Sequence, residues 1–306
     1  MIYDCVGMGI AVLDELAGLD AFPLPDSKNT LRFLHEQGGG PVPNALATLG
    51  RLGKRCALVS AMGRDRQALL LCRELRKFNV ETSYIQHLAG VPTSRAIILI
   101  NSSTGERTVL LRRHPDCSLE KSEELAAPIN KCRILHLDGH EPVACLRAAT
   151  LARRHGAQIS LDIGSSRSLS SELMELADIL IVSESYSRKV IGKNPEKSVE
   201  ELAQAGAKLT GVTCGIHGSY LYRNGETWYQ PCFKVKTVDS TGAGDVYHGA
   251  AVYGVLQDFS LQQISQFASA AAALKCQHLG GKKGIPEMTQ IRTFLEYHEV
   301  DVDFLS

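Results

Sequence analysis

Long apolar runs, paired cysteines and an excess of charge are all missing from this chain of 306 residues. No apolar stretch approaches the roughly 20 residues that a membrane-spanning helix needs, and the first residues lack the basic segment of a secretory signal. The nine cysteines contain no C-x-x-C pair, and an odd number cannot close fully into disulfides within one chain. We therefore expect reduced thiols, a cytoplasmic location and no membrane partner.

Net charge is also absent, because 33 Lys and Arg residues balance 33 Asp and Glu residues. A protein that binds nucleic acid through its phosphates presents a basic surface, so we expect no nucleic-acid partner. Internal repeats, low-complexity tracts and Pro-rich linkers are missing too, which argues against separate domains. With 44% hydrophobic residues the chain can build one large core, and we predict a single domain over residues 1–306.

What the sequence does contain is an alternation of short β-branched runs with amphipathic helical patterns. This alternation is typical of a mostly parallel sheet with helices on both faces, so we predict a doubly wound α/β fold. The predicted strands are residues 3–8, 55–60, 134–137, 158–162, 179–183 and 207–213. The predicted helices are residues 42–52, 68–78, 142–155, 198–205 and 246–256.

Two stretches interrupt this alternation, because residues 16–35 and 92–111 have the pattern of strand pairs. In the second stretch, apolar runs at 94–100 and 107–111 flank a polar turn, which predicts a hairpin. We predict that both stretches together form a small β-sheet lid. If this lid exposes an apolar face, pairing two lids in a homodimer would bury it.

The most informative segment is residues 238–250, which contains two glycines just before a predicted helix. Gly242 and Gly244 allow positive φ angles and bring backbone N–H groups close to a ligand. Those N–H groups and the positive end of the helix would stabilise the charge of a transferring phosphoryl group. Asp245, in the first turn of the helix, could accept a proton from an attacking hydroxyl group. The alternative is an ordinary turn in which Asp245 only caps the helix.

A second glycine cluster, at residues 38–40, precedes the predicted helix 42–52. Here the backbone could approach a polyol, and Asn44 offers both a donor and an acceptor to hydroxyl groups. Asp14 follows the first predicted strand, and a carboxylate there would anchor hydroxyl groups through charge-assisted hydrogen bonds. A structural helix-entry turn and a solvated loop acid are the respective alternatives.

The two glycine segments resemble the two signatures of the PfkB (ribokinase-like) carbohydrate kinases, D-T-x-G-A-G-D and G-G-x-x-x-N-x-A followed by L-G. Ser240 stands in place of the usual threonine, and Leu46 in place of a common alanine. The resemblance implies a ribokinase-like fold and an ATP-dependent sugar kinase with Asp245 as catalytic base. It further implies an anion hole at Gly242, Ala243 and Gly244, and a sugar site at Asp14, Gly39, Gly40 and Asn44.

The same resemblance implies a nucleotide site and cofactors. Thr213, Gly215 and Gly218 match the family's T-L-G-x-x-G turn, and Ser183 stands where many relatives begin an N-x-x-E motif that organises Mg²⁺. ATP and Mg²⁺ are therefore the expected cofactors, and a sugar and ATP the expected partners. In the ribokinase branch the positions of Asp239 and Thr241 line a monovalent-cation site, so potassium is a further candidate.

The chain departs from the family where Ser183 and Tyr186 replace both named residues of N-x-x-E. This leaves a second interpretation open, a catalytically weak sugar- or nucleotide-binding regulatory protein on the same fold. The chain is closest in appearance to bacterial sulfofructose kinase-like sugar kinases, but residues 137–141 lack the arginine that sulfonate recognition should show, so sulfofructose is not adopted. A nicotinamide-dependent dehydrogenase is disfavoured because the loop from Gly7 lacks the third glycine of G-x-G-x-x-G.

Overall fold

The computed structural model describes residues 2–120, 122, 126–164 and 170–305, which form two sheets with flanking helices. The large sheet has the strand order β14-β13-β12-β11-β10-β9-β1-β4-β5, and β6 pairs with β4. Its neighbouring strands are parallel except for the antiparallel edge formed by β13 and β14. The strands are β1 (Tyr3–Met8), β4 (Cys56–Gly63), β5 (Val80–Glu81), β6 (Ile85–Leu88), β9 (Cys132–Leu137), β10 (Gln158–Ile163), β11 (Ile179–Ser183), β12 (Leu209–Thr213), β13 (Ser219–Arg223) and β14 (Glu226–Gln230).

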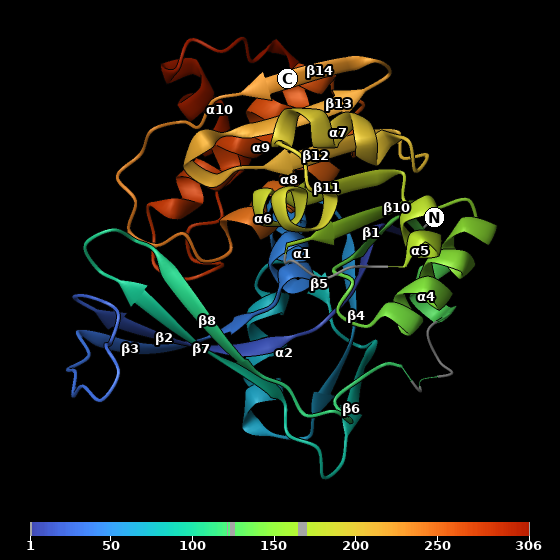
Figure 1. The fold of residues 1–306 in the computed structure, drawn as a ribbon. Coiled ribbons are helices and arrows are strands. Elements are labelled where there is room, and N and C mark those ends of the chain that lie inside the picture. Colours follow the sequence, from blue (N-terminus) through green and yellow to red (C-terminus); the bar gives the residue numbers. More distant parts are fainter. Residues whose placement is uncertain (1, 121, 123–125, 165–169, 306) are drawn as a thin grey trace.

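Helices cover both faces of the large sheet, as Figure 1 shows. Successive side chains of a strand point to opposite faces, so Cys5 packs in one apolar cluster and Val6 in the other. One face carries α1 (Pro41–Arg51), α2 (Arg66–Arg76), α8 (Ala243–Leu256), α9 (Leu261–Cys276) and α10 (Met288–Tyr297). The other face carries α3 (Ala126–Ile129), α4 (Pro142–Arg154), α5 (Ser171–Glu175), α6 (Glu184–Tyr186) and α7 (Pro195–Ala203). The predicted doubly wound α/β fold is confirmed.

Each predicted strand and helix corresponds to an observed one, with ends that differ by a few residues. The starts of α7 and α8 each lie three residues before the predicted ones, and α7 begins at Pro195 rather than at residue 198. Asn194 explains this start, because its side chain accepts a hydrogen bond from Lys197 N and the following proline occupies the first helical position. Within the described residues, no helix combines the length and apolar character that crossing a bilayer requires.

A separate small sheet begins shortly after β1 ends and has the order β3-β2-β7-β8 (Figure 1). The pair β2–β7 is parallel and the other two pairs are antiparallel. Its first two strands begin before residue 16 and end after residue 35, the predicted limits. The early start was missed because nearly all of β2 is buried and therefore shows no alternation of polar and apolar residues. Its strands are β2 (Val12–Leu19), β3 (Phe33–Gly39), β7 (Ser94–Asn101) and β8 (Arg107–Arg112).

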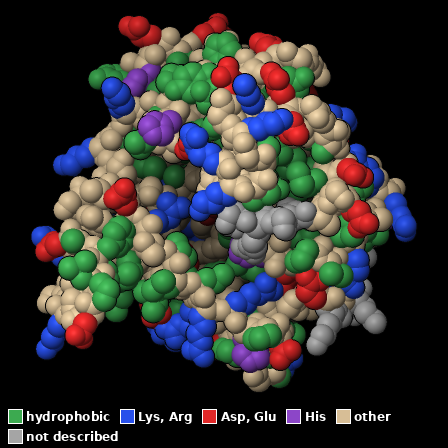
Figure 2. All heavy atoms as spheres, viewed as in Figure 1, with side chains coloured by type: hydrophobic (Ala, Val, Ile, Leu, Met, Phe, Trp, Pro, Cys, Tyr) green, Lys and Arg blue, Asp and Glu red, His purple; other side chains and the backbone are tan. Residues whose placement is uncertain are grey.

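One face of the small sheet carries exposed apolar side chains. Ile97 lies opposite Leu110 in the β7–β8 register, and Leu34 lies opposite Ala17 in the β2–β3 register. The relative exposures of Leu34, Ile97 and Leu110 are 63%, 44% and 52%. Figure 2 shows hydrophobic side chains gathered over this sheet, at the left of the view, beside a hollow whose rim carries Lys and Arg side chains. A surface of this kind favours a protein contact.

Helices α1 and α8 pack closely and bring the two ends of the sequence together. Close approach is possible because residue 249 is glycine, where a Cβ atom would lie 2.6 Å from the carbonyl oxygen of Ala45 and 2.8 Å from Thr48 Cβ. Most of α1 and α8 is buried, since one side of each helix faces the sheet and the other faces the neighbouring helix. The glycine clusters at both helix starts therefore lie at one end of this pair.

Candidate active site

The candidate site lies where the amino end of α8 meets the carboxyl ends of the central strands. The ring nitrogen His248 Nε2, on α8, lies 3.1 Å from Asp162 Oδ1 on β10. One residue earlier, the Tyr247 hydroxyl donates to Ser219 Oγ, at the start of β13, over 3.0 Å. These contacts attach α8 to the sheet edge at which open α/β folds bind their ligands.

Asp245 lies in the first turn of α8, as predicted, and its carboxylate is held by another helix. Asn44 Nδ2, on α1, donates to Asp245 Oδ2 over 2.7 Å. Burial raises the pKa of Asp245, and the nearby Asp162 carboxylate raises it further. The hydrogen bond from Asn44 and the positive charge of Arg107 oppose this rise. A half-buried carboxylate with a raised pKa is suited to accept a proton.

The three residues predicted for an anion hole lie at the start of α8. Gly242 caps α8 with φ of 76°, a left-handed conformation that favours glycine. The N–H groups of Gly242 and Gly244 have no acceptor among the described residues, so they are free for an anion at the positive helix end. Ala243 differs from the prediction, because its N–H already donates to Ser240 O over 3.2 Å. Because this bond closes the turn, two backbone amides rather than three remain available to bind an anion.

The residues predicted for the sugar surround Asp245 on the side of α1. Asp14 lies within buried strand β2 rather than on a loop, and burial raises its pKa to about 7 while the charge of Lys282 opposes the rise. A Cβ atom on Gly39 would lie 2.0 Å from Asp14 Oδ2, and one on Gly40 would lie 2.3 Å from the carbonyl of Ile10. Only glycine therefore fits between this carboxylate and the start of α1.

Asn44 has a further feature that points to a ligand. Its side chain is 3% exposed, and Oδ1 has no hydrogen-bond partner within the part of the chain that is described. The other amide atom, Nδ2, is already bound to Asp245. A buried acceptor without a partner is costly, so a hydroxyl donor from a substrate would stabilise it.

Lys282 completes this side of the site and was missed from the sequence. Its buried ammonium group donates to the carbonyl of Gly38 and lies 3.9 Å from Glu74 Oε2. Burial lowers the pKa of Lys282, whereas the charges of Glu74, Asp14 and Asp245 raise it. The glycine pair that precedes Lys282 is the signal that could have revealed it, because such a pair allows a close backbone approach.

Asp162, at the end of a predicted strand, pairs with His248, which was not predicted, near the Asp245 carboxylate. Both side chains are buried, and their contact places a second acid–base pair one helical turn from Asp245. His136 lies beside them, with its ring centroid 6.0 Å from that of His248 and Nδ1 3.0 Å from Ser160 Oγ. Burial lowers the pKa of His136 to about 4, so this ring is neutral at ordinary pH.

The residues predicted for the nucleotide share the edge formed by β11 and β12. Ser183 and Thr213 are register partners at the ends of these strands. Gly215 and Gly218 follow in the turn to β13, with φ angles of 55° and 83°. A Cβ atom on Gly218 would lie 2.1 Å from the carbonyl of Gln230, whereas Gly215 faces open space. Gly218 is therefore required by the fold, and Gly215 leaves room for a ligand.

The segment that departs from the N-x-x-E pattern does not form a magnesium site. Ser183 Oγ caps α6 by accepting from Tyr186 N over 3.2 Å. The Tyr186 ring is buried, and Glu184 forms an ion pair with Arg188 at 2.7 Å. No group of three His, Cys, Asp or Glu side chains that could hold a metal occurs in the described ranges. Any Mg²⁺ here would depend on the phosphates of a bound nucleotide.

Asp239 and Thr241 lie in the loop before α8 and are both buried. The Asp239 carboxylate accepts from Thr241 N over 2.8 Å and from Gly280 N over 2.7 Å. The Asp239 carbonyl accepts from Lys275 Nζ over 2.8 Å. All three oxygen atoms of Asp239 therefore have protein donors, which does not fit a bound potassium ion.

The turn between β7 and β8 reaches from the small sheet to the glycine loop. Arg107 Nη1 donates to Ser240 Oγ over 3.0 Å, and this hydroxyl donates to Gly105 O over 3.1 Å. A Cβ atom on Gly105 would lie 2.9 Å from Thr237 Cγ2. The small sheet thus contacts the loop that presents the free amides.

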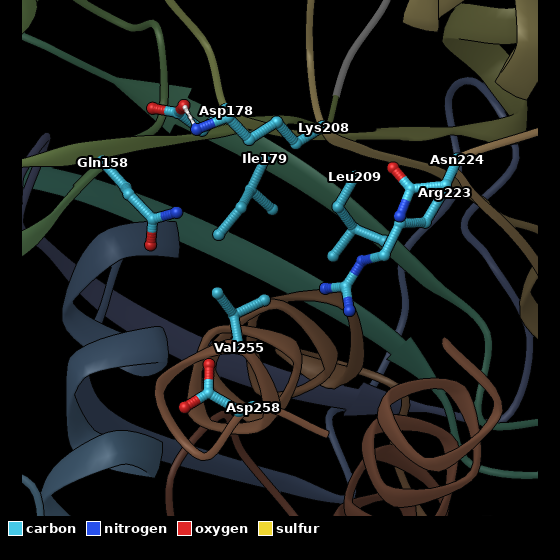
Figure 3. A pocket seen from close by; sticks show the side chains of 9 residues that line it. All are labelled: Gln158, Asp178, Ile179, Lys208, Leu209, Arg223, Asn224, Val255 and Asp258. Carbon is cyan, nitrogen blue, oxygen red and sulfur yellow. Dashed lines mark ion pairs between the residues drawn. The ribbon is translucent and has the colours of Figure 1, made fainter. Parts of the chain in front are cut away.

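A cavity of about 300 Å³ opens at the opposite edge of the sheet and is separate from this site. Figure 3 shows Arg223 pointing into it between Leu209 and Val255, with the ion pair of Lys208 and Asp178 at its rim. The cavity lies at the amino ends of β10 and β11. Ligands of open α/β sheets bind at the other end of the strands, so we do not assign the chemistry here.

Comparisons with known proteins agree with this geometry. The model of the pfkB family carbohydrate kinases matches residues 8–288. Ribokinase from Haemophilus influenzae is 24% identical over 300 residues, which cover 95% of this chain and 97% of that protein. The crystal structure of ribokinase from Thermotoga maritima has a TM-score of 0.82 and 24% identity, covering 96% of this chain and 99% of the other. The structure of Arabidopsis thaliana ribokinase complexed with ribose and ATP has a TM-score of 0.81 and 22% identity, covering 97% and 99%.

Proposed function

The chain belongs to the pfkB family of carbohydrate kinases, which are phosphotransferases with an alcohol group as acceptor, and from this premise we propose a specific reaction. The protein transfers the γ-phosphoryl group of MgATP to a sugar hydroxyl group, and Asp245 is the base. The observation that carries this proposal is the Asp245 carboxylate at the amino end of α8, 2.7 Å from Asn44 and beside two free backbone amides. Such a site can accept a proton and stabilise a phosphoryl group together.

The sugar is held between the two glycine segments. Asp14 accepts hydrogen bonds from hydroxyl groups at one end. Asn44 Oδ1 accepts another, which gives this buried atom the partner that the described chain does not supply. Asn44 Nδ2 keeps the Asp245 carboxylate directed at the reacting hydroxyl. Positioning of this kind converts the encounter of two substrates into a reaction within one complex.

The phosphoryl group is stabilised by the start of α8. The N–H groups of Gly242 and Gly244, with the positive end of the helix dipole, face the charge that spreads over the phosphoryl oxygens. ATP lies along the edge formed by Ser183, Thr213 and Gly215, from which its phosphates reach α8. A bound Mg²⁺ would neutralise phosphate charge. Because the chain lacks the N-x-x-E motif, the nucleotide phosphates would supply most of the ligands of this ion.

The small sheet acts as a lid and as a dimer interface in this proposal. The contact of Arg107 and Gly105 with Ser240 joins the lid to the loop before α8. Closure of the lid over the bound sugar therefore excludes water from the phosphoryl site. The exposed row of Leu34, Ile97 and Leu110 would be buried by the same face of a second copy. All nine cysteines are free thiols, which supports a reducing compartment such as the cytoplasm.

A second candidate function is a sugar- or nucleotide-binding regulator that transfers phosphate weakly. The geometry of Ser183 and Tyr186 favours it, because one caps a helix and the other is buried, so neither organises Mg²⁺. Sugar and nucleotide binding do not require that motif. Retained binding without turnover is therefore the result that this function predicts.

Mg²⁺-dependent ADP release, measured over a panel of ketoses, aldoses and nucleosides, tests the reaction. We expect turnover with at least one sugar, and a loss of about 10²- to 10⁴-fold in Asp245→Asn. ATP affinity, measured by calorimetry, should be nearly the same in both proteins. Near-normal turnover of the variant rejects Asp245 as the base, and binding without turnover across the panel supports the regulator.

A further inference from the structure

Lys275 is a fully buried lysine in the last turn of α9, next to the glycine loop of the candidate site. Its relative exposure is 0%. A lysine is almost never fully buried without a partner, because removing an ammonium group from water costs several kcal/mol. The reaction proposed above has no role for this side chain, so its position needs another explanation.

The ammonium group is bound to the loop that leads into α8. Lys275 Nζ donates to the backbone carbonyl of Asp239 over 2.8 Å. The amides of Val238 and Asp239 donate to Cys276 O over 2.8 Å and 3.2 Å, so the end of α9 and this loop are tied together. Burial lowers the pKa of Lys275, and the charge of Asp239 is the largest influence that opposes this change. The lysine thus has one carbonyl and one carboxylate to stabilise its charge.

The Asp239 carboxylate joins two loops in front of Lys275. It accepts from Thr241 N in its own loop and from Gly280 N in the loop after α9. A Cβ atom on Gly242 would lie 2.8 Å from Gly281 Cα, so the two loops are in direct contact. The position of Gly242, and with it the free amides of the anion hole, depends on this junction.

The oxygen atoms of Asp239 already have protein donors and are not free to hold an alkali ion. Such an ion is held by several oxygen atoms that replace its hydration shell. The three oxygen atoms of Asp239 already accept from Lys275, Thr241 and Gly280. Thr241 Oγ1 is buried and without a partner in the described part of the chain, and a single hydroxyl is too few ligands.

We propose that the Lys275 ammonium group is a built-in cation that takes the place of a bound monovalent ion behind the anion hole. It binds the Asp239 carbonyl, at the position where the family resemblance implied potassium, and holds the loop that presents Gly242 and Gly244. This inference rests on the proposed kinase function only for its effect on turnover. The protein therefore needs no potassium, and Lys275 is a positioning residue for the phosphoryl site.

The charge of Lys275 also reaches the reacting groups. Asp245 is among the charges that stabilise the ammonium form of Lys275, and Arg107 is among those that oppose it. A positive charge at this depth favours the ionised form of Asp245 and the negative charge of a phosphoryl group. A bound ion would have the same effect only at sufficient concentration, whereas the lysine is part of the chain.

The test compares salts and two Lys275 variants. ADP release and the melting temperature are measured in choline, sodium and potassium chloride at a constant ionic strength of about 0.1 M. For the wild type we expect less than a twofold change in turnover and an unchanged melting temperature. Lys275→Ala leaves a cavity beside Asp239 O, and we expect a loss of about tenfold or more in choline, as for a broken charged hydrogen bond. Potassium or methylammonium should restore several-fold of this loss and raise the melting temperature of the variant.

Lys275→Met is the matched control, because its long side chain fills the cavity and leaves no space for an ion. We expect it to be as inactive as Lys275→Ala in choline and to stay so in every salt. Lys282→Ala removes another buried lysine, at the proposed sugar site. The loss of turnover in this variant should not respond to potassium. A cation response of Lys275→Met or Lys282→Ala equal to that of Lys275→Ala would overturn the assignment.

The wild-type salt series decides the matter even where a variant does not fold. Strong activation of the wild type by potassium, or a rise in its melting temperature specific to potassium, contradicts a built-in cation. The melting temperature and the nucleotide affinity need no turnover, so they test Lys275 even if no member of the substrate panel is phosphorylated. A potassium-activated kinase would remove the role of Lys275 and leave the kinase function intact.

Discussion

Asn44 and Asp245 are separated by 201 positions in the chain, yet Asn44 Nδ2 donates to Asp245 Oδ2 over 2.7 Å. The contact exists because α1 and α8 pack closely through Gly249, so both helix starts lie at one edge of the sheet. One amide thereby holds the Asp245 carboxylate with its nitrogen, while its buried oxygen has no partner in the described part of the chain.

Replacing Asn44 with alanine should impair both functions of its amide. The hydrogen bond lowers the pKa of Asp245, so its loss raises that pKa and leaves the carboxylate less well directed. We expect kcat/KM to fall about 10- to 100-fold and the acidic limb of its pH profile to move to higher pH. Steady-state kinetics between pH 5 and 9 measure this, and a lower kcat/KM with an unmoved limb would limit Asn44 to substrate binding.

The pH dependence of the reaction should respond in opposite directions to changes at Asp162 and His248. The base acts in its ionised form, so kcat/KM rises with pH and becomes constant above the pKa of Asp245. The Asp162 charge raises that pKa and the His248 charge lowers it. We expect Asp162→Asn to move the acidic limb to lower pH and His248→Asn to move it to higher pH, each by about 0.5 to 1 unit.

Several other groups face Asp245 and set the background for this comparison. They are Asn44 from α1, Arg107 from β8, Asp14 from β2, Lys275 from α9 and Lys282 from the loop after α9. None of them is altered in either variant. Shifts in the same direction for Asp162→Asn and His248→Asn would indicate a general loss of structure in place of an electrostatic effect.

Two glycines of α8 should respond differently to alanine. At Gly249 the new Cβ atom would meet Ala45 O at 2.6 Å, so we expect a loss of about 1–3 kcal/mol in the free energy of unfolding. At Gly244 nothing lies within 4 Å, and alanine favours a helix by up to about 1 kcal/mol. Stability should therefore hold in Gly244→Ala while kcat/KM falls at least tenfold, because the methyl group enters the phosphoryl space.

Urea unfolding and steady-state kinetics on the two variants separate these effects. Gly244→Ala with normal activity would show that the phosphoryl group lies elsewhere. Gly249→Ala with normal stability would show that α1 and α8 can move apart at little cost.

Asp14→Asn should stabilise the ligand-free protein at high pH. The folded-state pKa of Asp14 is about 7, above its ordinary value of 3.8, so the carboxyl group makes folding less favourable as pH rises through this interval. At pH 8 the variant should be more stable by about 4 kcal/mol in the free energy of unfolding, and at about pH 3, below both pKa values, the two proteins should be nearly equal. Sugar affinity should fall, because a charge-assisted hydrogen bond is lost. A gain in stability that is the same at both pH values would contradict the pKa of Asp14.

The exposed face of the small sheet should control association. Leu110 is 52% exposed and lies opposite Ile97, so a charge there leaves the fold unchanged and prevents an apolar contact. We expect a dimer in the wild type and a monomer in Leu110→Glu by sedimentation velocity. Leu24→Glu is a control, since Leu24 is 75% exposed and lies outside the four strands of this sheet. A monomeric wild type would end the dimer proposal.

The strands of the α/β core were predictable because a buried parallel sheet requires continuous β-branched and aliphatic runs. The segments 3–8 and 179–183 match β1 and β11 in full. The start of the small sheet was misjudged, since Val12–Leu19 is buried along nearly its whole length and shows no alternation. Helices α9 and α10 were not predicted, although Ser260 and Gln263 form a capping box at the start of α9.

By itself the sequence determined the fold class and the two glycine segments with their polar residues Asn44 and Asp245. These depend on local chemistry, because periodicity selects strand or helix and glycine permits a close backbone approach. Only the tertiary structure decided the partners of Asp245, the burial of Lys275 against Asp239 and the contact of His248 with Asp162. Such contacts join residues far apart in the chain, and burial, which alters their charge and pKa, arises only when the elements pack together.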